Sequence, residues 1–208
     1  ALIDLGKLYK EGKGVSQDYK EALRLFRLGA KQGHEGAYLN LSEMYYDGEG
    51  VPQDLKKAAQ WCKRAAQQGN LSAHIILGCF YGIGGKGLAQ DYKEAVKWIK
   101  LPAEKGHAKA QYYLGTMYED GTGVTQDYKE AVKWYKLAAE KGIPIAQYSL
   151  GMMYEEGNGV PQDFQVTYRP QLFFSPMNFS FLRFLIKNHF HLIHCLILHL
   201  FFFHYQTY

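Results

Sequence analysis

The chain has 208 residues, enough for one or two ordinary domains, and a formal net charge of only +4. Residues 165–208 carry three basic residues and no acid, so the other 21 basic and 20 acidic residues nearly cancel. This balance lacks the strong positive excess of a nucleic-acid-binding protein, and no nucleic-acid partner is expected. The three cysteines form no C-x-x-C pair, so we interpret them as small buried residues. The chain begins at Ala1 rather than Met, as a fragment of a longer protein would, and the lack of a signal peptide therefore carries little weight.

The dominant pattern is an internal repeat. Alanines recur along the chain at intervals of 36, 36, 37 and 36 residues, and Leu, Tyr and Asp positions keep the same steps. The longer step arises because the turn YGIGGKG (81–87) has one residue more than YEDGTG (118–123), which costs little in a glycine-rich turn. The repeat predicts one domain over residues 1–164, with four full repeats and one half repeat. The aligned alanines are Ala1, Ala37, Ala73, Ala110 and Ala146.

Each repeat predicts two helices, of which the fourth repeat is the clearest example. Its first helix has an apolar face from Ala110 to Tyr118, and the glycines of DGTG end it. Its second helix starts at Asp127, where Asp127 and Glu130 form a capping-box pattern that recurs in the first and third repeats. In the second repeat, Asp54 has Lys57 in the place of the glutamate, so we expect its cap to lack the return hydrogen bond. The predicted buried stripe of the second helix is Ala131, Trp134, Tyr135, Ala138 and Ala139.

Two replacements depart from this pattern. Ser42 follows the leucine that recurs in the first helix of every repeat, at a position where the other repeats have glycine. We expect this serine to loosen the helix contact in the second repeat. Pro102 lies near the end of the second helix of the third repeat, where it removes a backbone donor. Together with the longer turn at 81–87, it predicts a local bend in the third repeat.

The stretch LGTMYEDGTGVTQDYKEAVKWYKLAAEKG (114–142) resembles a Sel1-like repeat, a relative of the tetratricopeptide repeat. The resemblance covers residues 1–164 and implies an all-α fold, a right-handed α-solenoid of stacked helix-turn-helix repeats. It also implies an adaptor or scaffold for protein complexes, with no catalysis, cofactor or small-molecule substrate. One Sel1-like subfamily is described as penicillin-binding or β-lactamase-like, with a cysteine pair in each repeat. Because Cys62 and Cys79 stand alone, such a hydrolase is the alternative rather than the expectation.

Acidic residues gather at the ends of several first helices, where negative charge is mildly unfavourable. Matched to the tetratricopeptide pattern through Leu-Gly-x-x-Tyr, these positions line the concave groove. We hypothesise an acidic, tyrosine-flanked groove that receives a basic or extended peptide; the alternative is a solvated face that keeps the solenoid soluble. The predicted partner-binding residues are Glu43, Asp47, Tyr112, Thr116, Glu119, Asp120, Tyr148, Met152, Glu155 and Glu156.

No motif for catalysis or metal binding emerges from the chain. GIGGKG (82–87) has Gly after its Lys and no preceding strand, so it is interpreted as a lengthened turn rather than a phosphate-binding loop. His34, His74 and His107 recur roughly once per repeat, which could bring their loops together, but no metal site is expected.

The repeat stops after Phe164. One period beyond Trp134 lies Pro170, and residues 165–208 contain no Ala, Gly, Asp, Glu or Trp. Three explanations stay open for this segment: a sequence that is no evolved continuation of the repeat, which we favour, a membrane-associating tail through 189–205, or an apolar helix that caps the solenoid. We favour a soluble intracellular adaptor, with a membrane-tethered adaptor as the alternative.

Overall fold

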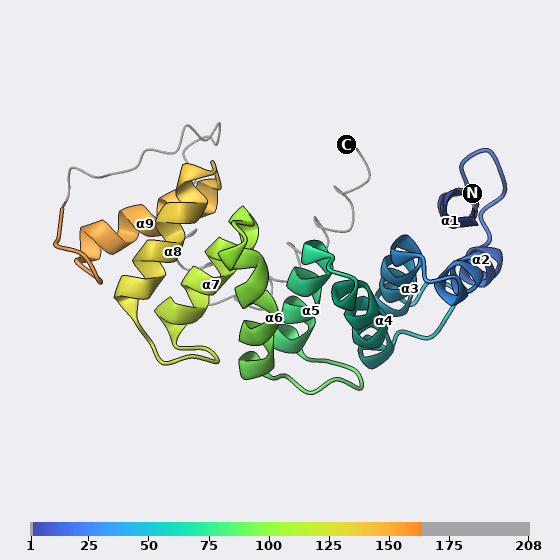
Figure 1. Ribbon diagram of the computed structural model, residues 1–208, viewed down its shortest axis with the longest axis horizontal. Helices are drawn as coiled ribbons and strands as arrows, with labels where there is room; N and C mark the ends of the chain where they lie inside the picture. Colours follow the sequence, from blue (N-terminus) through green and yellow to red (C-terminus); the bar gives the residue numbers. More distant parts are fainter. Residues whose placement is uncertain (1, 164–208) are drawn as a thin grey trace. The chain divides into compact units, whose positions relative to one another are not determined.

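The computed structural model describes residues 2–163, which form helices joined by short turns (Figure 1). Within this range no strand is present beyond an isolated bridge between Gly85 and Leu88. The tail after Phe164 and its three explanations lie outside the described residues. The helices are α1 (Leu2–Glu11), α2 (Tyr19–Lys31), α3 (Glu35–Asp47), α4 (Leu55–Gln67), α5 (Leu71–Ile83), α6 (Tyr92–Glu104), α7 (Ala108–Asp120), α8 (Tyr128–Glu140) and α9 (Pro144–Glu156).

The chain divides into two compact units, of which unit 1 ends at Gln90 and unit 2 begins at Asp91. The repeat period alone does not predict this division. It falls at the end of the lengthened turn of the third repeat, which the structure confirms as a turn: it folds back on itself through the Gly85–Leu88 bridge. Pro102 is buried inside α6, which continues to Glu104, and the bend expected there stays a prediction.

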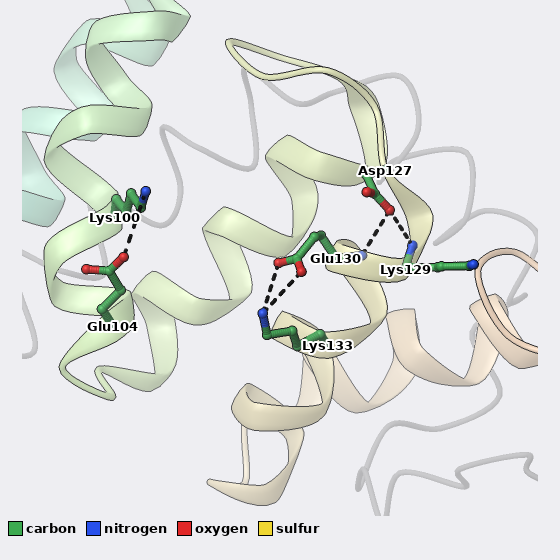
Figure 2. Close-up of polar contacts among 6 residues, drawn as sticks. All are labelled: Lys100, Glu104, Asp127, Lys129, Glu130 and Lys133. Carbon is green, nitrogen blue, oxygen red and sulfur yellow. Dashed lines mark hydrogen bonds and ion pairs between the residues drawn. The ribbon is translucent and has the colours of Figure 1, made fainter.

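The second helix of each full repeat starts at an aspartate, as predicted. The Asp127 carboxylate accepts hydrogen bonds from the backbone N–H groups of Lys129 (2.9 Å) and Glu130 (3.1 Å) at the start of α8 (Figure 2). Asp18 caps α2 in the same way, and Asp54 accepts from Lys57 at the start of α4. These caps orient the second helices and satisfy backbone donors that the helix itself leaves open.

The predicted return bond of the capping box is not made in α8. The Asp127 backbone N–H donates instead to the Tyr118 carbonyl of the preceding helix at 2.9 Å. The Glu130 carboxylate is therefore free to pair with Lys133 along the helix at 3.1 Å. Asp54 lacks the return bond as expected, because its N–H donates to the Tyr45 carbonyl of the preceding helix, but in this it does not differ from Asp127.

Small residues on the first helices set how closely the second helices pack. In unit 2, Gly115 of α7 faces the fully buried ring of Tyr135 from α8, and Phe26 lies against Gly6 in the same way in unit 1. At the equivalent position in the second repeat, the structure has Ser42, which is 1% exposed and donates to the Ala58 carbonyl at 2.9 Å.

A smaller side chain on the facing helix leaves room for Ser42, at which we expected a looser helix contact. Its helix partner at the position of Phe26 and Tyr135 is Cys62, a much smaller side chain that is itself fully buried. The extra hydroxymethyl group therefore occupies space that an aromatic ring fills in the first and fourth repeats. On α8, by contrast, one predicted core residue differs: Trp134 is only half-buried, and Lys133 Nζ lies 5.6 Å from its ring centroid.

Candidate protein-interaction surface

The predicted partner-binding residues fall into both compact units. Glu43 and Asp47 belong to α3 of unit 1, whereas the other eight belong to α7 and α9 of unit 2. The two groups are therefore separate sets of neighbours, and each is described within its own unit.

In unit 2, α7 and α9 both pack against α8, and successive helices reverse direction (Figure 1). The C-terminal ends of α7 and α9 consequently lie on the same side. The Tyr112 side chain of α7 lies close enough to Ser149 of α9 for this serine to lower the pKa of Tyr112, although burial outweighs that effect. The acidic surface formed by these two helix ends consists of Glu119, Asp120, Glu155 and Glu156.

The Glu119 carboxylate accepts a hydrogen bond from Tyr135, a residue that the sequence pattern did not predict as part of this surface. The Tyr135 hydroxyl donates to Glu119 Oε2 at 2.5 Å, from α8 to α7. Burial, with the Glu119 charge adding to it, raises the pKa of Tyr135 well above its ordinary value, so the hydroxyl stays a donor. A signal was available in the repeat alignment: Phe26, Cys62 and Ile99 occupy the equivalent positions, and none of them carries a hydroxyl.

The tyrosines and neighbouring side chains are placed at different depths. Tyr112 is only 7% exposed, and its ring centroid lies 5.7 Å from that of Tyr135, so it belongs to the core beneath the surface rather than flanking a groove. Burial is the main cause of the raised pKa of Tyr112. Thr116, Tyr148 and Met152 are half-buried, and Thr116 Oγ1 donates to the Tyr113 carbonyl of its own helix at 2.8 Å.

The backbone at both acidic helix ends is fixed by the following turn. Gln126 Nε2 donates to the Glu119 carbonyl at 2.7 Å, and Gln162 Nε2 donates to the Glu155 carbonyl at 2.9 Å. Asp120, Glu155 and Glu156 are exposed, although partial burial still raises the pKa of the Asp120 carboxyl. The arrangement is thus a set of exposed carboxylates on an ordered backbone.

In unit 1 the predicted residues do not form an equivalent surface. Lys10 Nζ lies 2.7 Å from Glu43 Oε2 and 3.3 Å from Glu49 Oε2, and the Lys10 and Glu43 side chains are 10% and 14% exposed. Burial alone would lower the pKa of Lys10, but the two carboxylates outweigh it and raise that pKa. Burial also raises the pKa of Glu43 more than Lys10 lowers it. Glu43 is therefore engaged inside the unit, and of the predicted pair only Asp47 is exposed.

The histidines and cysteines show no reactive arrangement in the part of the chain that the structure describes. His34 and His107 precede α3 and α7, and His74 Nδ1 donates to the Asn70 carbonyl at 2.8 Å. No group of three or more His, Cys, Asp or Glu within residues 2–163 is placed to hold a metal ion. Cys62 and Cys79 are buried and unpaired, and burial raises the pKa of Cys79 to about 12, which keeps it protonated. Nor does any helix between residues 2 and 163 have the length and apolar character to span a bilayer.

Comparison with known proteins gives matches along the repeats. A 34% identical structure, c5321, a protective antigen of uropathogenic Escherichia coli with an SLR fold, aligns with a TM-score of 0.73 over 79% of this chain and 35% of that one. A Sel1 repeat protein of Oxalobacter formigenes, 36% identical, aligns with a TM-score of 0.69 over 79% of this chain and 47% of that one. The chain therefore spans less than half the length of either relative, and a search of curated proteins found no match. The Sel1 repeat model matches residues 1–34, 36–70, 71–107, 108–143 and 144–168.

These matches confirm the predicted all-α solenoid of helical repeats. The last matched segment continues to residue 168, slightly beyond the boundary predicted at 164.

Proposed function

Because the chain belongs to the Sel1 repeat family, whose members are generally protein-interaction scaffolds, we propose that it is an adaptor that binds a protein partner and catalyses no reaction. The partner-binding site is the acidic surface of unit 2, and the partner presents a basic or extended peptide. Thr116, Tyr148 and Met152 lie on the same two helices and supply less polar contacts beside the carboxylates.

The observation that carries this proposal is the exposed charge at the ends of α7 and α9. Within residues 2–163, neither Asp120 nor Glu155 forms an ion pair with Lys or Arg. A carboxylate at a helix C-terminus faces the negative end of the helix dipole, so these charges are unfavourable on their own. A cationic partner would relieve that repulsion, and the ordered backbone reduces the entropy lost on binding.

The test measures binding of a fluorescein-labelled peptide of about twelve residues, with alternating Lys and Ser, by fluorescence anisotropy. We expect the full chain to bind it and the D120K/E155K variant to bind about fivefold more weakly or worse. The matched control is E104K/E140K, which makes the same change in charge at the exposed last residues of α6 and α8. All four substitutions favour the helix dipole, so none should impair folding.

The outcome decides between a local surface and a general charge effect. The proposal requires the control to change affinity by less than about twofold, because its residues lie outside the acidic surface. Equal weakening in both variants, or no binding of the peptide to the unaltered chain, would contradict it.

A further inference from the structure

We propose that the exposed side of α2 and α4 in unit 1 is a second docking surface, which binds an acidic segment of a protein partner. It involves none of the residues of the acidic surface and does not depend on the function proposed above. This basic face consists of Lys20, Arg24, Arg27, Lys31, Lys56, Lys57, Lys63 and Arg64.

The cations of the basic face are concentrated by helical spacing. On α2 they occur at intervals of four, three and four residues, which places them along one side of the helix. All eight are exposed. The only acids on α2, α4 and their caps are Asp18, Glu21 and Asp54, so eight positive charges less three negative ones leave a local excess of five.

This excess is not a general property of the repeat. The equivalent helices of unit 2, α6 and α8, carry six lysines and have two more at their C-caps, Lys105 and Lys141, but four glutamates and two N-cap aspartates reduce the local excess to two. Figure 2 shows two of the resulting pairs, Lys100 with Glu104 (3.9 Å) and Lys133 with Glu130 (3.1 Å). The position of Lys31 illustrates the difference, because Glu104 and Glu140 occupy it in unit 2.

Tyr45 of α3 joins the two basic helices into one surface. Arg27 Nη2 of α2 donates to the Tyr45 hydroxyl at 3.2 Å, and Lys57 Nζ of α4 lies 5.4 Å from the centroid of the same ring. Arg27 of α2 and Lys57 of α4 therefore lie near each other through their shared contact with Tyr45.

Several cations of the basic face are available to an anionic partner. Among the residues that the structure describes, Lys20, Lys31 and Lys56 have no acidic partner. A shallow hollow of about 250 Å³ also runs along α2 between the cations, with Leu23 and Leu28 in its lining. An acidic segment with an occasional apolar side chain could therefore form ion pairs along roughly 16 Å of α2 and place that side chain in the hollow.

A protein partner fits these observations better than a bilayer or a nucleic acid. The large apolar side chains that are exposed between residues 2 and 163 are Leu5, Leu8, Leu101 and Tyr128, and none lies on α2 or α4, where insertion into a bilayer would need them. The Trp61 ring stacks on Tyr38 and has the Arg64 guanidinium 4.8 Å from its centroid, so it offers no open platform for a base.

The test uses the full chain and a fluorescein-labelled peptide of about twelve residues with alternating Glu and Ser. The K20E/K56E variant alters two cations of the basic face, and the matched control K93E/K129E alters the same repeat positions in unit 2. All four lysines are the second residues of their helices, where glutamate favours the dipole, so folding should be retained. We expect K20E/K56E to bind the peptide about fivefold more weakly or worse, and the control to change affinity by less than about twofold.

Parallel measurements use vesicles of phosphatidylcholine and phosphatidylserine, and a single-stranded oligothymidylate. Equal weakening in the two variants would overturn the inference, because it would reduce the effect to net charge. Failure of the acidic peptide to bind the unaltered chain would overturn it as well. If the chain bound vesicles or oligothymidylate more strongly than the peptide, and K20E/K56E abolished that binding, the inference would be overturned in favour of a membrane or a nucleic-acid partner.

Discussion

Gly115 is the position where the packing of two helices of unit 2 can be tested most directly. A Cβ atom at this residue would lie 2.7 Å from both Cδ1 and Cε1 of Tyr135. Carbon atoms in good contact are roughly 3.5–4.0 Å apart, so the methyl group of alanine cannot be accommodated without movement. Tyr135 is 0% exposed and its hydroxyl is bonded to Glu119, so its ring has no open space to enter. We therefore predict that Gly115→Ala destabilises the protein.

Two effects oppose each other in this substitution, and their sizes decide its sign. Alanine gains about 0.5–1 kcal/mol over glycine inside a helix. Overpacking a well-filled core costs about 1–3 kcal/mol. The balance is a loss of about 1 kcal/mol, equivalent to a fall in Tm of roughly 4–8 °C for a unit of this size.

The assay is thermal unfolding followed by circular dichroism, with Gly36→Ala as the matched control. Gly36 is also helical, but a Cβ there would meet only Ile3 Cγ2 at 3.7 Å, an ordinary contact. The control should leave Tm unchanged or raise it, because only the helix preference acts. If Gly115→Ala also raised Tm, the argument that ring contact dictates glycine at this position would be refuted.

Three further predictions concern charged groups. Lys10→Met should lower the free energy of unfolding in urea by about 3 kcal/mol, because it leaves Glu43 largely buried without its cation, and Lys10→Met with Glu43→Met should recover most of that loss. Asp127→Ala should cost about 1 kcal/mol in the same assay, since two N–H groups of α8 lose their acceptor. Folding raises the pKa of Asp120, so its carboxylate opposes folding at neutral pH and ceases to do so below its ordinary value of 3.8. Asp120→Asn should accordingly be more stable than the unaltered chain at pH 7, and a series of urea titrations should show the difference vanishing below about pH 3.8.

The helix pairs and their caps could be predicted because they depend on residues close together in the sequence. Asp127 caps the backbone two and three residues ahead, and Gly121 ends α7 with a φ of 70°. The capping-box return bond was predicted wrongly because an acceptor on the previous helix competes for the same donor. The Asp127 N–H donates to the Tyr118 carbonyl instead of the Glu130 carboxylate. Local spacing cannot reveal such a competitor.

The depth of the site residues was harder to predict, because it depends on which face of a helix the neighbouring helices cover. Tyr112 and Tyr148 occupy the same repeat position, yet Tyr112 is buried and Tyr148 is half-buried. Tyr112 lies close to Ser149 of the following first helix, α9. The exposure of a residue therefore cannot be read from its repeat position alone, and the exposed acids at the helix ends are a narrower set than the ten predicted residues.

The repeats of the chain differ at two kinds of position: buried positions whose side-chain sizes are constrained by packing, and outer positions whose charges vary. Positions that face the neighbouring helix covary, as Ser42 with Cys62 and Gly115 with Tyr135, because the available volume is shared between them. The outer positions of the second helices are under no such constraint, and there acidic residues offset most of the positive charge in unit 2 but much less of it in unit 1. A charge difference at positions with the same structural role cannot be explained by stability of the repeat, since α6 and α8 fold in the same way with a smaller positive excess. It is the kind of difference that we expect from binding, and it agrees with the anionic partner proposed for unit 1 and the cationic partner proposed for the acidic surface of unit 2.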